Sequence, residues 1–223
     1  YTNIEFNNKL IIADVYDLGE ENLKYGMYLF TDLFWDKIKK DRNIKKTIYL
    51  EITTRCNLAC PFCPSSDEKN HFDMDIKKCK EVIDKIKDNV EILYFHVLGE
   101  PILHSNFSEI VEYAHQNGLK LGLTTNGVEI NKITKVMLEE YFEKINISLQ
   151  CLIKFSNERR KKYLDNLKQF IVFKNMHSPK LPINLRLWND KSKKEINNLN
   201  QKIEDTINDW LNEQDYQNIR FSY

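Results

Sequence analysis

The stretch "TIYLEITTRCNLACPFCP" (residues 47–64) joins a β-rich run to three closely spaced cysteines. Its first seven residues, 47–53, are rich in β-branched and aromatic side chains, which favours a strand. Cys56, Cys60 and Cys63 then fall within eight positions of a chain that has five cysteines in all. Thiols crowded this tightly do not suit an ordinary disulfide framework. They indicate metal or redox chemistry in a reduced compartment, and we expect the cytoplasm.

The chain beyond this stretch alternates strand-like and helix-like segments. Further strands are expected at 91–97, 120–125, 144–150, 183–188 and 218–223, and helices at 75–89, 106–117, 131–142, 157–174 and 192–211. A capping box, Ser192 with Glu195, would begin the last helix. Six strands, each followed by a helix except the last, predict an α/β fold with a parallel sheet. Periodicity alone does not decide between an open doubly wound sheet and a partial barrel.

Length and charge limit the organisation and the partners. A chain of 223 residues suits one core domain, expected at 47–223, preceded by an N-terminal extension, 1–46, that forms a small hairpin or an extra strand and helix. Lys plus Arg and Asp plus Glu each number 33, so the formal net charge is zero and nucleic acid is not an expected partner. No apolar run approaches the ~20 residues that cross a bilayer, so we expect no membrane association.

The unusual motifs all follow expected strands. The cysteine loop follows the first strand, and "LGEP" (98–101), "TTNG" (124–127), "SLQC" (148–151) and "RLWND" (186–190) follow the next four. In parallel α/β folds functional residues collect at the carboxyl ends of the strands. The motifs therefore predict one shared site. The loop after the first strand, from Thr54 to about Met74, is also the longest, which is typical of a functional loop.

Three thiolates at this spacing can coordinate a soft metal or a cluster from one side and leave one position open. A structural zinc site would need a fourth ligand, for which His71 and Cys79 are the nearest candidates. An eight-residue knuckle at the end of a parallel strand has no stabilising task, however. We therefore favour a site with an open position.

The pattern Cys-x₃-Cys-x-aromatic-Cys in "CNLACPFC" (56–63) resembles the signature of the radical S-adenosylmethionine (SAM) enzymes. "LGEP", "TTNG", Ser148 and Arg186 resemble later motifs of that superfamily in the same order, and the resemblance covers residues 47–223. It implies a partial (β/α)₆ barrel and a four-iron, four-sulfur cluster held by Cys56, Cys60 and Cys63, with SAM chelated at the fourth iron. An electron from a reductant such as flavodoxin or ferredoxin would then cleave SAM to methionine and a 5′-deoxyadenosyl radical, which abstracts a substrate hydrogen.

The resemblance also implies a set of SAM contacts. Phe62 would lie near the adenine, although simple packing of the loop is an alternative. Gly99, Glu100 and Pro101 match the superfamily's "GGEP" segment, which receives the SAM amino group. Leu98 stands here in place of the first glycine.

Ser148 and Arg186 match positions that engage the ribose or the methionine carboxylate of SAM. A guanidinium suits a carboxylate, but Arg186 could instead face outward into solvent. Asn126 could hydrogen-bond near the site or only shape the turn that follows its strand. His96 and His104 flank "LGEP" and are interpreted as structural donors, so we assign no catalytic residue.

Two cysteines remain outside the signature. Cys79 lies on the apolar stripe of its helix and is expected in the core. Cys151 follows the fourth strand, where a thiol could donate a hydrogen atom to a substrate radical, but burial is the favoured interpretation. Two thiols are too few for a second four-thiolate cluster. The sequence thus represents either a minimal radical SAM enzyme or one whose terminal part is missing.

A partial barrel is open on one side and suits a large substrate, so the expected activity is radical modification of a peptide or protein. Activation of a glycyl-radical enzyme is the alternative within the enzyme class, and small metabolites and RNA stay open. The rival from another class is a non-enzymatic interaction module in which the cysteines hold only zinc.

Overall fold

The computed structural model describes residues 11–13, 47–63, 71–88, 90–188, 194–212 and 218–223. The chain divides into two compact units. Unit 1 comprises Tyr1–Cys56 and Asp67–Gly122, and unit 2 comprises Asn57–Ser66 and Leu123–Tyr223. The cysteine loop therefore contributes residues to both units. Each unit is described by itself below.

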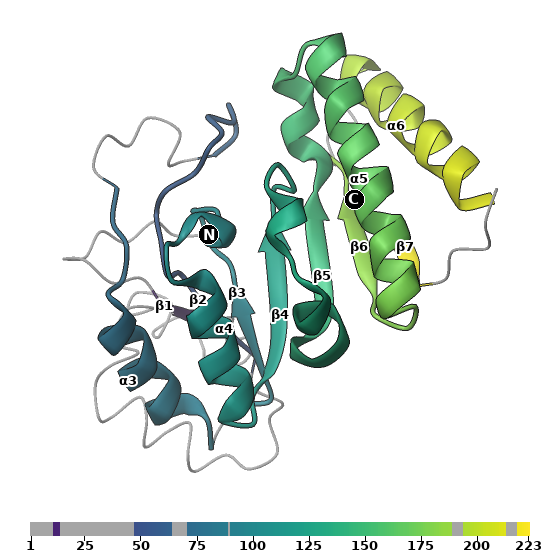
Figure 1. Ribbon diagram of the computed structural model, residues 1–223. Helices are drawn as coiled ribbons and strands as arrows, with labels where there is room; N and C mark the ends of the chain where they lie inside the picture. Colours follow the sequence, from purple (N-terminus) through teal and green to yellow (C-terminus); the bar gives the residue numbers. More distant parts are fainter. Residues whose placement is uncertain (1–10, 14–46, 64–70, 89, 189–193, 213–217) are drawn as a thin grey trace, which may run out of the picture. The chain divides into compact units, whose positions relative to one another are not determined.

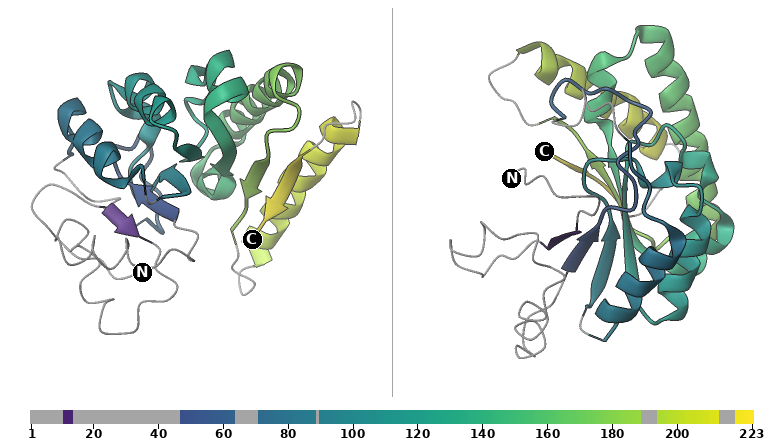
Figure 2. Two further views of the ribbon diagram at one scale, coloured as in Figure 1. Left: turned by 90° about the horizontal axis from the view of Figure 1, so that it is seen from below. Right: turned by 90° about the vertical axis from the view of Figure 1, so that its left-hand side faces the viewer.

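Unit 1 is built on three strands, β1 (Ile11–Ala13), β2 (Thr47–Leu50) and β3 (Ile92–Phe95). β1 pairs antiparallel with β2, and β2 pairs parallel with β3, with Thr47 opposite Ile92. The helices are α3 (Ile76–Ile86), α4 (Phe107–Gln116) and the short turn η2 (Pro101–Leu103). α3 and α4 lie side by side and cover one side of β2 and β3 (Figure 1, Figure 2).

The amphipathic pattern of the sequence explains this packing. The Asp75 side chain caps α3 by accepting a hydrogen bond from the Lys78 N–H at 2.9 Å. The buried residues of α3, namely Cys79, Val82, Ile83 and Ile86, form one face of the helix. Phe95 of β3 is fully buried and its ring contacts Phe107 of α4 at 6.1 Å between centroids. The apolar stripes of the helices thus cover one face of the strands.

Unit 2 contains β5 (Phe142–Ser148), β6 (Ile183–Arg186) and β7 (Ile219–Ser222), which pair in parallel in that order. Its helical elements are η3 (Ile130–Lys132), η4 (Met137–Tyr141), η5 (Leu149–Lys154), α5 (Asn157–His177) and α6 (Lys194–Asn212). α5 lies against one side of β5 and β6 (Figure 1). β4 (Lys120–Thr125) crosses the boundary between the units after Gly122.

Side chains of β5 and β6 alternate between two environments. Ile145, Ile147, Ile183 and Leu185 are buried on the side of the helices. Because successive side chains of a strand point to opposite faces, Asn146, Ser148, Asn184 and Arg186 lie on the other face. Two of the candidate site residues from the sequence, Ser148 and Arg186, therefore lie on this polar face.

The predicted α/β fold is confirmed. The strand order follows the chain order from β1 to β7, and a helix or helical turn follows each of β2 to β6, as in a partial (β/α)₆ barrel. β4 occupies the range predicted for it. β2 ends at Leu50, three residues before the predicted end, and the ends of β3, β5, β6 and β7 lie within two residues of theirs. The boundary at residue 46, most of the extension 1–46 and Ser192 of the capping box lie outside the described residues.

The prediction of a helix at 131–142 is wrong. Two short turns, η3 and the π-helical η4, replace it, and β5 already begins at Phe142. Thr134 starts a new turn between them, because its hydroxyl oxygen accepts from the Met137 N–H at 3.4 Å and its carbonyl from the Leu138 N–H at 3.2 Å. The β-branched residues Ile130, Ile133 and Thr134 also lower the helix propensity of the segment.

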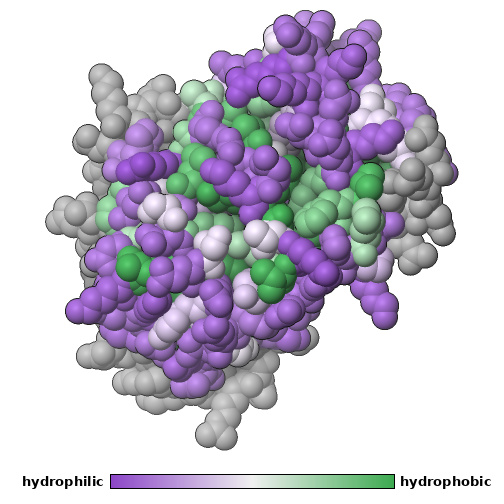
Figure 3. All heavy atoms as spheres, viewed as in Figure 1, coloured by the Kyte–Doolittle hydropathy of each residue, from purple (hydrophilic) through white to green (hydrophobic). Residues whose placement is uncertain are grey.

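The outward sides of the helices are polar. Over α3 and α4 the surface in Figure 3 is mainly hydrophilic, as amphipathic helices predict. None of the helices that the structure describes combines the length and apolar composition needed to span a bilayer.

Candidate active site

The three clustered cysteines lie in the loop that follows β2. Cys56 ends the first segment of unit 1, Tyr1–Cys56, whereas Cys60 and Cys63 belong to unit 2. All three are half-buried and none forms a disulfide. The Cys63 N–H donates to the Cys60 carbonyl at 3.0 Å, so these two residues share one tight turn. Among the described residues, no three His, Cys, Asp or Glu side chains stand close enough together to hold a metal ion.

The long loop that carries the cysteines is closed at its base within unit 1. The Thr54 N–H donates to the Phe72 carbonyl at 2.8 Å, and the Met74 N–H donates to the Ile52 carbonyl at 2.8 Å. The Asp73 carboxylate accepts from the Thr53 hydroxyl at 2.6 Å and pairs with Arg55 at 3.1 Å. The segment that leads into Cys56 is therefore held in a defined conformation.

Glu51, the first residue after β2, anchors the "LGEP" segment within unit 1. Its carboxylate oxygen accepts from the N–H groups of Leu98, at 2.8 Å, and Gly99, at 2.9 Å. The Glu100 N–H donates to the Arg55 carbonyl at 2.7 Å. Glu51 is 5% exposed, and the sequence analysis missed it. The signal was present, because a Glu in the otherwise apolar run "TIYLEIT" needs a partner.

Gly99 is required where it lies because a side chain would not fit. A Cβ at this position would stand 1.9 Å from the carbonyl oxygen of Thr53. The next residue, Glu100, is buried, and its carboxylate accepts from the Ile102 N–H at 3.4 Å, which caps η2 ahead of Pro101. "GEP" thus has a structural basis in unit 1 besides the predicted contact with a cofactor.

Asn126 of "TTNG" contacts the cysteine loop within unit 2. Its side-chain N–H donates to the side-chain oxygen of Asn57 at 2.8 Å, while its own side-chain oxygen accepts from the Val128 N–H at 2.9 Å. The Tyr163 hydroxyl donates to the Asn126 carbonyl at 2.8 Å. Asn126 therefore shapes its turn and also reaches the residue after Cys56. Tyr163, on α5, was not predicted from the sequence.

The turn is tight enough to require Gly127. This glycine has a φ of +74°, and a Cβ on it would stand 2.3 Å from the Tyr163 hydroxyl oxygen. The Cys151 thiol donates to the Asn126 carbonyl at 3.7 Å and its side chain is buried. The burial expected for Cys151 is confirmed, and its thiol stabilises the turn at Asn126 by this hydrogen bond.

Ser148 and Arg186 are direct neighbours on the polar face of unit 2. They occupy opposite positions in the register of β5 and β6 and are both half-buried. Neither side chain forms a hydrogen bond or ion pair with another residue in the described part of the chain. A half-buried guanidinium without a counter-charge suits an anionic ligand.

Phe62 forms an aromatic pair with Trp188 in unit 2. Their ring centroids are 4.3 Å apart with the planes tilted by 41°, and Phe62 remains 38% exposed. The Trp188 indole N–H is buried without an acceptor among the described residues. The Asn200 side chain donates to the Trp188 carbonyl at 2.8 Å and holds the loop after β6. The pair offers an apolar ring surface, and Trp188 is an addition to the predicted residues.

The histidine next to "LGEP" and the cysteine of α3 have structural roles, as predicted. His104 uses both ring nitrogens, one with the Met74 carbonyl at 2.8 Å and one accepting from the Asn106 N–H at 3.0 Å. Cys79 is fully buried, and desolvation, followed by the charge of Asp75, raises the pKa of its thiol to about 12. Cys79 is therefore an unfavourable thiolate donor.

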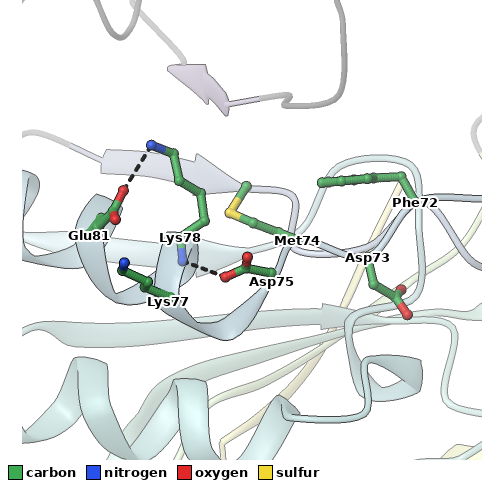
Figure 4. A pocket seen from close by; sticks show the side chains of 7 residues that line it. All are labelled: Phe72, Asp73, Met74, Asp75, Lys77, Lys78 and Glu81. Carbon is green, nitrogen blue, oxygen red and sulfur yellow. Dashed lines mark hydrogen bonds and ion pairs between the residues drawn. The ribbon is translucent and has the colours of Figure 1, made fainter.

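A pocket of about 200 Å³ lies in unit 1 where the cysteine loop returns to α3 (Figure 4). Its lining consists of Phe72, Asp73, Met74, Asp75, Lys77, Lys78 and Glu81. Two of its charged groups already pair with one another, since the Lys78 side chain contacts Glu81 at 3.0 Å. The pocket contains none of the residues that the sequence nominated.

Comparison with known proteins gives a consistent result. Residues 50–171 match the Radical SAM superfamily. The chain is 37% identical over 101 residues to an S-adenosylmethionine-dependent nucleotide dehydratase of Selenomonas ruminantium, covering 44% of this chain and 36% of that protein. It is 33% identical over 103 residues to the mycofactocin maturase MftC of Mycolicibacterium smegmatis, covering 44% of this chain and 26% of that protein. The chain thus spans well under half the length of these relatives.

Among solved structures, Streptococcus suis SuiB bound to its precursor peptide SuiA superposes with a TM-score of 0.55 at 16% identity. The superposition covers 100% of this chain and 58% of that one. SuiB bound to S-adenosylmethionine gives a TM-score of 0.53 at 15% identity, covering 90% of this chain and 59% of that one. At these identities the likeness concerns the fold.

Proposed function

Because the chain belongs to the radical SAM superfamily, which uses a four-iron, four-sulfur cluster and SAM, we propose that it modifies a peptide or protein by hydrogen abstraction. The single observation that carries the proposal is the Cys56, Cys60, Cys63 signature, directly after β2, within a matched region of 122 residues (50–171). When bound, the cluster and SAM supply a 5′-deoxyadenosyl radical as the hydrogen-abstracting species.

The donor set suits such a cluster. Three thiols on one short loop, none of them in a disulfide, are soft ligands that leave one iron for another donor. Cys79 and Cys151 are buried and used elsewhere, so neither competes for the site. In this proposal the loop between Cys56 and Cys63 draws its thiols together around the cluster.

The other residues predicted from the sequence would contribute contacts to SAM. In unit 1, Glu100 and the backbone of Gly99 and Pro101, fixed through Glu51, would receive the amino group. In unit 2, the Arg186 guanidinium, which has no ion-pair partner among the described residues, would bind the carboxylate of SAM, with Ser148 beside it toward the ribose. The exposed Phe62 ring, supported by Trp188, would face the adenine. Asn126 would steady the cysteine loop through Asn57.

A peptide or protein substrate is supported by the shared fold with SuiB, whose structure holds a precursor peptide. This support is an analogy of fold. A nucleotide is the second candidate, because the dehydratase of Selenomonas ruminantium is named for a nucleotide substrate and shares 37% identity over its matched region. A flavodoxin or ferredoxin would supply the electron, and the cytoplasm remains the expected location.

The test is anaerobic reconstitution with iron and sulfide followed by reduction in the presence of SAM. The expected result is a brown protein that releases 5′-deoxyadenosine. Cys60→Ala should lose both the cluster absorption and SAM cleavage, whereas Cys79→Ala, which removes a buried thiol instead, should retain both if the variant is folded. A colourless protein that binds zinc and leaves SAM intact would instead support the interaction-module hypothesis.

A further inference from the structure

Three side-chain polar atoms are buried without a hydrogen-bond partner in the part of the chain that the structure describes: Arg160 Nε, Asn175 Oδ1 and Trp188 Nε1. Another nitrogen of the Arg160 guanidinium donates to two backbone carbonyls, at 3.2 and 3.0 Å, which gives this side chain a structural role. Asn175 lies in the last turn of α5, which leads back toward the start of β6. Trp188 instead follows the carboxyl end of β6, and its ring contacts Phe62. Of the three atoms, Trp188 Nε1 is therefore the one placed to meet a ligand of the predicted site.

The backbone at Trp188 is held in a defined position. The Asn200 side chain of α6, only 7% exposed, donates to the Trp188 carbonyl at 2.8 Å, and the Gln150 side chain donates to the Leu187 carbonyl at 3.4 Å. The Leu187 N–H also donates to a carbonyl of β7 at 2.8 Å, so the strand pairing continues to this residue. Leu187 is buried, and by strand alternation Trp188 lies on the opposite face, together with Arg186.

The indole N–H of Trp188 lacks the acceptor that a buried donor needs. An indole nitrogen donates only, and burying it without an acceptor costs free energy. Buried tryptophans therefore normally donate to a neighbouring polar group. Here the ring of Trp188 packs on the hydrocarbon ring of Phe62, at 4.3 Å between centroids. An acceptor on a bound molecule would remove the cost, and the free energy gained would contribute to the affinity for that molecule.

Phe62 is the neighbour that a bound molecule meets first, because its side chain is 38% exposed. At 4.3 Å the two rings are in direct contact, so a third ring does not fit between them. A flat ligand that reaches the indole N–H must therefore shift the Phe62 side chain. The exposure of Phe62 permits this movement, whereas the backbone of Trp188 is fixed by Asn200.

We propose that Trp188 binds the adenine of SAM by donating its indole N–H to a ring nitrogen of the base. The inference rests on the proposed function, in which Phe62 faces the adenine. The N1, N3 and N7 atoms of adenine are acceptors, so the base offers the group that the indole lacks. Arg186, two residues earlier on the same face, matches the carboxylate of SAM through its planar guanidinium, which leaves the base to Trp188.

The experiment measures the affinity of S-adenosylhomocysteine for the anaerobically reconstituted chain by isothermal titration calorimetry. This compound keeps the adenine, ribose and carboxylate of SAM but has no sulfonium bond to cleave. Trp188→Phe keeps an aromatic ring and removes the N–H, so the Kd should rise roughly threefold to tenfold. Trp210→Phe is the matched control on α6, where the ring lies 5.6 Å from the Lys168 ammonium, and its Kd should equal the wild-type value.

Analogues that lack one ring nitrogen distinguish a hydrogen bond from packing. The probes are the 1-deaza, 3-deaza and 7-deaza forms of S-adenosylhomocysteine. One of them should bind wild-type protein roughly threefold to tenfold more weakly than the parent compound, but should bind Trp188→Phe as tightly as the parent does, because that variant has no N–H to lose. If Trp188→Phe is unfolded, Trp188→Met, which also lacks a donor, takes its place.

The results that would overturn the proposal are distinct. A purely structural role of Trp188 would weaken the parent compound and all three analogues by one common factor. A wild-type Kd in Trp188→Phe, or equal affinity of wild-type protein for the parent compound and every analogue, would also refute it. 5′-Methylthioadenosine lacks the carboxylate, so its affinity should fall in Trp188→Phe as well. Unchanged affinity for this probe would assign the N–H to the carboxylate instead of the base.

The two levels of inference fail in different ways. If the reconstituted wild-type protein holds no cluster and cleaves no SAM, the proposed function fails. If SAM is cleaved but no analogue shows a loss that depends on the Trp188 N–H, only the role of Trp188 is refuted.

Discussion

Gly99→Ala is the substitution whose consequence follows most directly from the geometry of unit 1. The new Cβ would lie 1.9 Å from the Thr53 carbonyl oxygen and 2.7 Å from the carbonyl carbon. An ordinary contact is at least 3.4 Å, so the two backbone segments must separate by about 1.5 Å. Both partners are backbone, and neither can turn away as a flexible side chain would.

That separation would disrupt the hydrogen bonds that hold "LGEP". The bonds from the Leu98 and Gly99 N–H groups to Glu51 measure 2.8 and 2.9 Å, and the bond from Glu100 to Arg55 measures 2.7 Å. Bonds to charged groups contribute more than neutral ones, so the combined loss is about 3 kcal/mol. For a chain of this length the loss corresponds to a decrease in Tm of roughly 6–12 °C.

The assay combines thermal unfolding with isothermal titration of SAM into anaerobically reconstituted protein. Because Glu100 would move with Gly99, SAM affinity should fall about tenfold or more. Gly118→Ala is the matched control: its φ of +82° makes alanine strained, but nothing lies within 4 Å of the new Cβ. It should lower Tm and leave SAM affinity unchanged. Wild-type Tm together with wild-type SAM affinity in Gly99→Ala would refute this reasoning.

Three further outcomes are expected. Glu51→Ala leaves the half-buried N–H groups of Leu98 and Gly99 without their acceptor, so it should lower the free energy of unfolding by about 3 kcal/mol in urea titrations. Glu51→Gln keeps a carbonyl oxygen and should lose less; equal losses in the two variants would contradict the role of the shared acceptor. Asn126→Ala removes the 2.8 Å hydrogen bond to Asn57 and should lower the iron content after reconstitution. Tyr163→Phe keeps that hydrogen bond and should keep the wild-type iron content. Equal iron content in the two variants would contradict a role of the Asn126–Asn57 bond in holding the cysteine loop. Burial raises the pKa of the Cys79 thiol to about 12, so this thiol should resist iodoacetamide at pH 9 in the native chain and react after unfolding. Its contribution to stability should be lost as the pH rises from 9 toward 12, because the thiol of the unfolded chain loses its proton at a lower pH than the buried thiol. Rapid alkylation of the native chain at pH 9 would contradict its burial.

The sequence by itself determined the alternation of strands and helices and the positions of the unusual motifs. Strand β4 and helices α3, α4 and α6 lie close to their expected ranges, because hydrophobic periodicity and capping residues are local properties of the chain. The cysteine signature is equally local, since the spacing of Cys56, Cys60 and Cys63 is written in eight consecutive residues. The helix expected at 131–142 failed because Thr134 caps a new turn inside the apolar pattern.

Only the tertiary structure decided which distant residues support the motifs. Glu51 accepts hydrogen bonds from Leu98 and Gly99, which are separated from it by 47 and 48 positions in the sequence. Asn126 forms hydrogen bonds with Tyr163 and Asn57, which are separated from it by 37 and 69 positions. The register of β5 and β6 likewise brings Ser148 and Arg186 to one face, a relation that no local pattern encodes. The physical reason is that periodicity fixes which face of an element is buried, whereas the pairing of elements fixes which polar groups meet.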